Sequence, residues 1–359
     1  MWNKPITVLV TGGGAPGIAG TLYALRNNSD GVKVRVIVCD MRDEVIGKYL
    51  ADKFYVVPSA ESPDFIDALL EVADHEDVNV ILPQVTRELL PLSENVHRFE
   101  AQGIAVAVAS KTSIERANDK WMVLEAAKAC GVPCPEGVLT YSEVELVQAV
   151  KAFGYPARKV VVKPRLSNGL RGLRILSEDF WDVTRFLKEK PGTLEIRLDE
   201  LLAILRNGRW PELIVQEFLP GAEYTVDVFR GHHGAVAIPR LREEIRSGIT
   251  FQARVELRAD LEQFALQLAE ELDLRYAFGF QFKLSEEGIP KLLECNPRVQ
   301  GTMVTAMFAG CNVIWWAVKE ALGEKVVPNK PNSSVNGMRF IRYWGGLAVY
   351  GDGKTAGPI

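Results

Sequence analysis

Cysteine and histidine are both scarce in this chain. Its 359 residues include five cysteines, an odd number, in a chain long enough to build a core without disulfide bonds. The composition argues against a disulfide framework and favours a reducing compartment, which predicts a cytoplasmic protein. Cys130 and Cys134 are close in sequence, but no second Cys or His pair lies near them. We interpret them as small buried side chains beside a turn rather than as a metal site.

An excess of positive charge is also absent. Lys and Arg total 42, whereas Asp and Glu total 46, which gives a formal net charge of -4. No overall field attracts a polyanion, so nucleic acid is not an expected partner. Long apolar runs are missing as well, because none approaches the roughly 20 residues of a membrane helix. The N-terminus lacks the pattern of a signal peptide, so no membrane partner is expected either.

The first hundred residues alternate between strand and helix patterns. Hydrophobic residues are 47% of the chain and charged residues 25%, the balance of a folded protein with two or three packed units. The periodicity predicts strands at 6–10, 33–39, 54–57, 79–82 and 104–107, with helices at 18–25 and 65–73. This alternation predicts a doubly wound, largely parallel α/β sheet over residues 1–112.

The pattern changes after residue 112. One helix is predicted at 113–130 as a connector, and Gly131 and Pro133 end it. The strands predicted after it are 159–163, 213–217, 224–229, 235–239, 278–284 and 289–294, and the helices are 180–189, 198–207, 260–272 and 304–321. Mixed strands with helices to one side predict an α+β domain over 113–330. The tail, residues 331–359, follows no clear pattern.

A Gly-rich turn follows the first predicted strand. Gly12-Gly-Gly14-Ala-Pro-Gly17 fits the pattern G-x-G-x-x-G, and Asp40 ends the next strand. Backbone N–H groups at such a turn bind a dinucleotide phosphate and the acid binds a ribose, so an NAD site is one interpretation. The other interpretation is a close-packed turn between strand and helix that borders a smaller anionic substrate.

A second Gly-containing loop follows the strand at 159–163. The segment Lys163-Pro-Arg-Leu-Ser-Asn-Gly169-Leu-Arg-Gly172 joins a lysine, fixed at a strand end, to a flexible loop with further cationic side chains. A fixed charge and backbone donors together suit the oxygens of a triphosphate. The pattern differs from G-x-x-x-x-G-K-[ST], so a P-loop is not implied. An exposed basic hairpin is the alternative interpretation.

The later strands carry groups suited to a nucleotide and its metal. The strand at 213–217 stops before Pro220, which frees backbone groups around residues 217–219 for the edge of a planar base. Glu294 and Asn296 lie two residues apart on a predicted strand and therefore share one face. Their oxygens suit Mg²⁺ when phosphates complete the shell. Arg298, on the same face, is suited to neutralise a phosphoryl group in transfer.

Taken in order, these segments resemble an ATP-grasp enzyme, most closely one synthetase unit of the large subunit of carbamoyl phosphate synthetase. The resemblance runs from the Gly-rich first strand to about Gly310. It is carried by Asn118-Asp-Lys120, Lys163-Pro with Ser167-Asn168-Gly169, Glu217-Phe-Leu219-Pro-Gly, Glu223-Tyr-Thr-Val-Asp227, Gln281 and Glu294-Cys-Asn296-Pro-Arg298. It implies a Rossmann-like pre-ATP-grasp domain at 1–112, without a dinucleotide, and then an ATP-grasp fold of two α+β subdomains. These are a lid subdomain at about 133–217 and a C-terminal subdomain at about 218–330, after the connector 113–130.

The resemblance also implies ATP and Mg²⁺ as cofactors, with a role for each site residue. Its nucleotide-binding residues are Lys120 and Lys163 on the phosphates, Ser167, Gly169 and Gly172 in the closing loop, Glu217, Phe218 and Leu219 at the adenine, and Glu223 on the ribose. Its metal ligands are Gln281, Glu294 and Asn296. Arg298 and Lys163 are implied as the catalytic residues, with Arg298 facing the acyl-phosphate centre.

Short relatives of this kind resemble carboxylate–amine ligases, and the chain has room for only one synthetase unit. The predicted function is therefore an ATP- and Mg²⁺-dependent ligase that forms an amide from a small-molecule carboxylate and amine, with ADP and phosphate as products. One alternative is a synthetase unit that makes carboxyphosphate from bicarbonate. Another is a non-catalytic nucleotide-binding subunit, against which the complete Glu294, Asn296 and Arg298 set argues. A homodimer is the default expectation.

Four arginines outside this set have two interpretations each. Arg87 follows the strand at 79–82 and either holds a substrate carboxylate or makes a surface salt bridge. By analogy with the resemblance, Arg240, Arg242 and Arg246 line the acceptor side, where they suit an anionic substrate. They form a solvated strand edge in the other interpretation.

Overall fold

The computed structural model describes residues 5–167, 169–179, 182–188 and 194–357. The chain divides into two compact units. The first unit comprises Met1–Ala117, Glu223–Phe282 and Cys295–Ile359, and the second comprises Asn118–Ala222 and Lys283–Glu294. Within the described ranges, no helix is both long and apolar enough to cross a bilayer.

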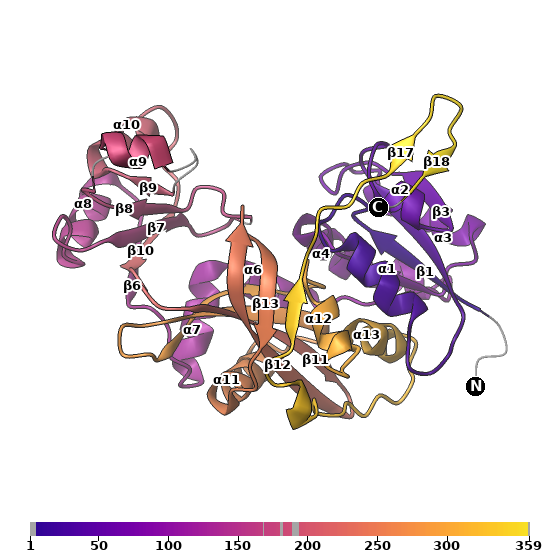
Figure 1. Ribbon diagram of the computed structural model, residues 1–359. Coiled ribbons are helices and arrows are strands. Elements are labelled where there is room, and N and C mark those ends of the chain that lie inside the picture. The colour runs from indigo at the N-terminus through magenta and orange to yellow at the C-terminus, as the bar shows by residue number, and fades with distance from the viewer. Residues whose placement is uncertain (1–4, 168, 180–181, 189–193, 358–359) are drawn as a thin grey trace. The chain divides into compact units, whose positions relative to one another are not determined.

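A parallel sheet of five strands begins the first unit (Figure 1). Its order is β3-β2-β1-β4-β5, and its strands are β1 (Ile6–Thr11), β2 (Val34–Asp40), β3 (Lys53–Val56), β4 (Val80–Leu82) and β5 (Ala105–Val106). The helices of this region are α1 (Ile18–Arg26), α2 (Gly47–Leu50), α3 (Phe65–His75), α4 (Thr86–Glu94) and α5 (Val96–Glu100). Chain order reverses between β1 and β4, and open α/β sheets bind ligands at the carboxyl ends of strands at such a point. The predicted doubly wound sheet is confirmed.

A mostly antiparallel sheet of six strands has the order β15-β14-β11-β12-β13-β16. Its strands are β11 (Glu223–Gly231), β12 (Gly234–Arg246), β13 (Ile249–Val255), β14 (Tyr276–Leu284), β15 (Pro290–Asn296) and β16 (Arg339–Ile341). Helix α11 (Ala259–Glu271) packs on β11 and β12 through its buried residues Leu261, Ala265 and Leu268. Alternate residues of these strands face opposite ways. Glu223 and Asp227 of β11 therefore lie on the face opposite Val226 and Val228.

The second unit contains a sheet of order β6-β10-β7-β8-β9. Its strands are β6 (Gly137–Thr140), β7 (Val160–Pro164), β8 (Arg174–Leu176), β9 (Glu195–Ile196) and β10 (Leu213–Glu217). Helices α8 (Glu143–Ala152) and α10 (Leu198–Leu205) bury leucines against β7 and β10 in one apolar cluster. Helix α9 (Val183–Lys188) is the described part of the helix predicted at 180–189, whose residues 180, 181 and 189 lie outside the described residues.

The single connector helix predicted at 113–130 is wrong, because the chain forms two helices there. These are α6 (Lys111–Asn118) and α7 (Lys120–Ala129). Asp119 has extended backbone angles and its carboxylate accepts hydrogen bonds from the Trp121 and Met122 N–H groups. An aspartate that caps a helix in this way begins a new one.

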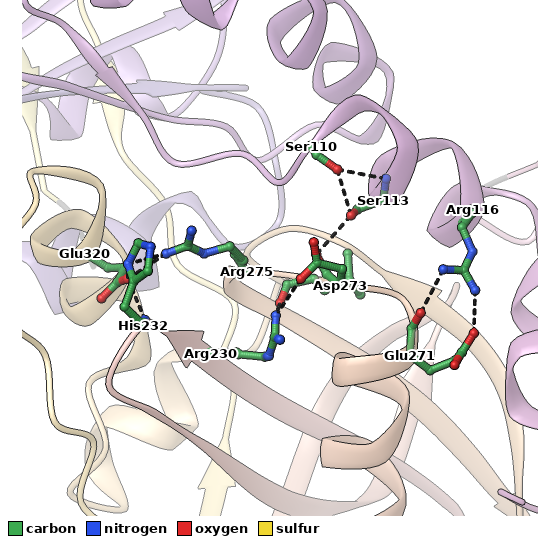
Figure 2. Close-up of polar contacts among 10 residues, drawn as sticks. Ser110, Ser113, Arg116, Arg230, His232, Glu271, Asp273, Arg275 and Glu320 are labelled. Atoms are coloured by element: carbon green, nitrogen blue, oxygen red, sulfur yellow. Dashed lines mark hydrogen bonds and ion pairs between the residues drawn. The ribbon is translucent and has the colours of Figure 1, made fainter. Parts of the chain in front are cut away.

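Polar contacts hold α6 to the end of α11, as Figure 2 shows. The Arg116 guanidinium donates to the carbonyl and the carboxylate of Glu271, both at 2.7 Å, and the Ser113 hydroxyl donates to the Asp273 carbonyl at 2.9 Å. Arg230 of β11 donates to the Asp273 carboxylate at 3.0 Å. The turn after α11 therefore joins α6 to the six-stranded sheet within the first unit.

The segment predicted as one helix at 304–321 is also two helices. They are α12 (Val304–Phe308) and α13 (Val313–Ala321), separated by Gly310 with a φ of +84°. Beyond them the tail forms a 3-10 turn (Ser333–Val335), the edge strand β16 paired with β13, and a small hairpin of β17 (Ala348–Val349) and β18 (Thr355–Ala356). The tail therefore completes the six-stranded sheet. All five cysteines lie within the described residues, and no two of them form a disulfide bond.

Candidate active site

Two buried lysines form the centre of the predicted phosphate site in the second unit. Lys163 lies on β7, where its Nζ donates to the Leu293 carbonyl at 3.2 Å. Burial lowers the pKa of Lys163 to about 8, and the nearby Glu294 carboxylate counteracts this shift. Lys120, at the start of α7, has a pKa that burial lowers and Glu294 raises. The structure therefore brings Lys120, Lys163 and Glu294 together.

The two buried lysines at this place share one carboxylate. Arg165 forms ion pairs with Asp119 at 2.7 Å and with Glu212 at 2.9 Å, whereas Glu294 is the carboxylate that raises the pKa of both lysines. The Lys120 Nζ donates to the Ser167 carbonyl and lies 3.2 Å from the Ser167 hydroxyl. Two ammonium groups that share one carboxylate are suited to bind an anion such as a polyphosphate.

The loop after Lys163 has a left-handed backbone at two glycines, and one of them leaves no room for a side chain. Gly169 and Gly172 have φ values of +63° and +75°, and a Cβ on Gly172 would lie 2.5 Å from the Pro164 side chain. Glycine populates this region without the steric cost that other residues meet. Asn168, a part of the predicted motif, lies outside the described residues. The loop geometry fits a close approach of backbone to a ligand.

The predicted adenine hinge begins where β10 ends. The Glu217 N–H donates to the Glu136 carbonyl at 3.0 Å, so this backbone donor is engaged within the second unit. The Glu217 carboxylate accepts from the Glu136 N–H at 2.8 Å and from Lys291 at 2.6 Å. The Lys283 ammonium lies 5.4 Å from the centre of the Phe218 ring, and Leu219 is buried. The Glu217 N–H, expected to be free for a base, is therefore occupied by Glu136, and the adenine contact stays a prediction.

The first unit holds a buried network around Arg242. Its guanidinium forms an ion pair with Glu223 and donates to the Thr250 hydroxyl at 2.8 Å and to the Gly248 carbonyl at 2.7 Å. It also lies 3.4 Å from the Gln281 Oε1. Glu223, the predicted ribose ligand, and Gln281, a predicted metal ligand, therefore share one arginine.

The solvated-edge interpretation of the later arginines is wrong for Arg240 and Arg242. Arg240 is 1% exposed and pairs at 2.8 Å with Asp227, which is fully buried on the neighbouring strand β11. Arg246 differs, because it is exposed and pairs with Glu244 on its own strand. Burying a charge is costly unless it is paired, so the two inner arginines are built into the sheet.

The predicted metal ligands have the oxygen chemistry that Mg²⁺ prefers. Glu294 and Asn296 are alternate residues of β15 and share a face, and Gln281 lies on the neighbouring strand β14. The Asn296 Oδ1 lies 3.4 Å from the Arg298 guanidinium and the Gln281 Oε1 lies 3.4 Å from that of Arg242. Both amide oxygens therefore face an arginine, and a bound Mg²⁺ would replace these long contacts. The donor set itself, one carboxylate and two amide oxygens, is one that Mg²⁺ accepts. The described residues contain no cluster of three His, Cys, Asp or Glu side chains, and this set includes only one such residue.

The Gly-rich turn is closed by the chain's own groups. The Asp40 carboxylate accepts from the Gly14 N–H at 2.8 Å and from the Arg42 N–H at 2.9 Å, and so holds the turn itself. A Cβ on Gly17 would lie 2.8 Å from the Gly301 Cα, which places the turn against the loop after Arg298. The close-packed interpretation therefore fits better than the NAD interpretation. Arg87 is exposed and pairs with Glu61 at 3.1 Å, as the surface interpretation predicts.

The sequence analysis missed a buried polar group at the carboxyl ends of β1 and β4. The Thr11 hydroxyl donates to the Glu88 carboxylate and accepts from the Gln84 N–H at 3.2 Å. Burial raises the pKa of Glu88 to about 7, although the Thr11 hydrogen bond lowers it. The available signal was position, because polar residues that follow β4 stand where open sheets bind ligands.

Comparison with known proteins identifies the fold class. Residues 209–341 match a family model described as ATP-grasp in the biosynthetic pathway with Ter operon, and residues 8–107 match a PylC-like N-terminal domain. The chain thus has a PylC-like N-terminal domain followed along the sequence by an ATP-grasp fold. This confirms the ATP-grasp resemblance and the predicted fold class.

Solved structures of this fold are similar over most of the chain. N5-carboxyaminoimidazole synthetase from Staphylococcus aureus, complexed with ADP, is 14% identical, with a TM-score of 0.65 over 92% of this chain and 81% of that one. Biotin carboxylase from Campylobacter jejuni is 16% identical, with a TM-score of 0.67 over 90% and 72%. The biotin carboxylase domain of Hydrogenobacter thermophilus 2-oxoglutarate carboxylase, with MgADP and bicarbonate, is 19% identical, with a TM-score of 0.66 over 89% and 70%.

The Lys163 geometry predicts how activity depends on pH. Because the free enzyme must carry the Lys163 ammonium to attract phosphate, kcat/KM for ATP should be flat below pH 7 and fall about tenfold per pH unit above about 8. Initial rates at saturating acceptor measure this. Lys163→Met is the control, because a variant without the ammonium should be weaker and show no break near pH 8. A wild-type profile still flat at pH 9.5 would contradict the assignment.

Proposed function

We propose that this chain is an ATP- and Mg²⁺-dependent, ADP-forming ligase that activates a carboxylate and joins it to an amine. One observation carries the proposal: Lys120 and Lys163, both buried, flank the Glu294 carboxylate on a chain with an ATP-grasp fold. Two desolvated ammonium groups beside one acid suit polyphosphate oxygens and the metal that accompanies them.

The chain's own residues act mainly by positioning and by neutralising charge, as phosphoryl transfer requires. Lys120 and Lys163 hold the phosphates, Ser167, Gly169 and Gly172 cover them, Glu217, Phe218 and Leu219 receive the adenine, and Glu223 binds the ribose. Gln281, Glu294 and Asn296 would hold Mg²⁺. The ion, when bound, supplies positive charge at the phosphate oxygens. Arg298 stabilises the charge of the phosphoryl group in transfer.

The proposed reaction has two steps. A carboxylate oxygen attacks the γ-phosphorus, and the bond from that phosphorus to the ADP oxygen breaks. The amine nitrogen then attacks the acyl carbon, the carbon–oxygen bond breaks, and phosphate leaves as the amine loses a proton. The partners are thus a small-molecule carboxylate and amine. We further propose a cytoplasmic homodimer with a pre-ATP-grasp domain at 1–112 and an ATP-grasp domain at 113–330. The five described cysteines form no disulfide bond with one another, which supports the cytoplasmic part.

A screen of carboxylates paired with amines tests the proposal through ADP release that depends on both substrates. Bicarbonate belongs in the screen as a second candidate, because one similar structure is described with bicarbonate. Bicarbonate-dependent ADP release at the rate of the best carboxylate would favour carboxyphosphate chemistry. Nucleotide binding with no substrate-dependent ADP release would instead favour the non-catalytic subunit.

Nucleotide preference separates this proposal from the NAD interpretation. Mg-ATP at a hundredfold excess over its Kd should stabilise the folded chain by about 2.7 kcal/mol, because a ligand that binds only the folded state acts by mass action. NAD⁺ and NADH should have no effect. Thermal unfolding with each nucleotide measures this. Stabilisation by NADH but not by Mg-ATP would contradict the proposal and favour the NAD interpretation.

A further inference from the structure

Arg298 is fixed by a residue far away in the sequence. Its Nε donates to the Thr86 hydroxyl at 2.9 Å, a contact that joins the loop after β15 to the first residue of α4 within the first unit. Its Nη1 donates to the Val299 carbonyl at 3.0 Å, and Nη2 lies 3.4 Å from the Asn296 Oδ1. Those two partners lie within two residues of the arginine in sequence, whereas Thr86 ties the guanidinium to the region of the parallel sheet.

Hydrogen bonds hold the segment around Thr86 to other elements of the first unit. Two positions on in α4, the buried Glu88 accepts a hydrogen bond from Thr11 at the end of β1. Thr21 of α1 donates to the Gln84 Oε1 at 2.7 Å, just before α4 begins. The first turn of α4 is therefore held by β1 and α1, so Thr86 has a well-defined position.

The loop after Arg298 is held at a second place. Arg342 donates to the Gly301 carbonyl at 2.7 Å and to the Pro16 carbonyl at 2.8 Å. Gly17 approaches Gly301 too closely for a Cβ. The Gly-rich turn thus packs against the loop that carries Arg298, and Thr86 accepts a hydrogen bond from the guanidinium on that loop.

We infer that Thr86 is a positioning residue for the reaction, because its hydroxyl orients the Arg298 guanidinium toward the transferring phosphoryl group. This inference rests on the proposed function. It gives the N-terminal domain a part in the chemistry. A planar guanidinium stabilises charge only when its N–H groups point at that charge, so loss of its anchor should slow the chemical step.

Three variants test the role of Thr86. Thr86→Val keeps the shape and removes the hydroxyl, Thr86→Ser keeps the hydroxyl, and Thr112→Val is an exposed control in the same unit. Thr86→Val should lower kcat by about 10 to 100-fold, with the KM for ATP within about twofold and an unchanged melting temperature. The kcat of Thr86→Ser should stay within about threefold of the wild-type kcat. The kcat of Thr112→Val should equal that of wild type. An unchanged kcat in Thr86→Val, or a loss of kcat and thermal stability that serine does not rescue, would overturn the inference.

A second measurement does not need turnover. In protein labelled with ¹⁵N-arginine, the Arg298 Nε–H resonance, assigned by its loss in Arg298→Lys, should exchange slowly in wild type and Thr86→Ser and rapidly in Thr86→Val. Equal exchange in all three would overturn the inference. If no substrate pair gives ADP release in wild type, the proposed ligase activity fails, and the resonance alone then decides whether Thr86 orients Arg298.

Discussion

Replacing Glu294 by alanine is expected to reduce turnover by about a thousandfold or more while the fold survives. Glu294 is the one carboxylate among the proposed metal ligands, and it raises the pKa of both Lys120 and Lys163 against the effect of burial. Its loss removes a charged ligand and leaves two buried lysines without their shared counter-charge. The pKa of Lys163 should then fall below about 8, so residual activity should decline at a lower pH than in wild type.

Steady-state rates and the circular dichroism spectrum of Glu294→Ala measure this effect. Glu286→Ala is the matched control, because Glu286 is an exposed acid in the turn between β14 and β15. It should keep wild-type activity. A folded Glu294→Ala protein with near-normal activity would remove the metal assignment.

Lys163→Ala is expected to weaken ATP use far more than Arg171→Ala does. Lys163 is 4% exposed on β7, so its ammonium is fixed and desolvated, whereas Arg171 is exposed in the loop before Gly172. The lysine variant should lose about a hundredfold to a thousandfold in kcat/KM for ATP. The arginine variant should lose less than about fivefold, because exposed charges contribute little.

Lys163→Met separates the charge from the packing, because its side chain fills a similar volume without an ammonium group. It should be as impaired as Lys163→Ala while melting close to wild type. Equal losses in Lys163→Ala and Arg171→Ala would make the loop, rather than the strand lysine, the main phosphate clamp.

Local sequence patterns predict most of the strands. They do not predict where one helix ends and the next begins, and they miss one helix. Strand 213–217 was placed to the residue, since a buried apolar run followed by Pro220 is unambiguous. The segment 113–130 is predicted as one helix because its apolar spacing continues through Asp119. The Asp119 carboxylate instead caps a second helix. Helix α8 was missed although Ser142 accepts from the Glu145 N–H, a cap visible in the sequence.

Site residues within one segment were easier to predict than pairings between distant segments. Alternation along β15 put Glu294 and Asn296 on one face. The partner of Arg240 is Asp227, which only the pairing of β11 with β12 brings near it, since the register sets Asp227 opposite Ile238, two residues before Arg240. Thr86 and Arg298 form a hydrogen bond although 212 positions separate them, and the sequence of neither segment predicts this contact.

The transfer of carboxylate oxygen to phosphate tests the ligase mechanism most directly. With the substrate pair found by the screen, a carboxylate labelled with ¹⁸O should pass one labelled oxygen into the released phosphate, with ADP as the other product. The label moves because a carboxylate oxygen attacks the γ-phosphorus and the bond to carbon then breaks. Labelled AMP with pyrophosphate, or unlabelled phosphate accompanying the amide, would contradict the acyl-phosphate mechanism.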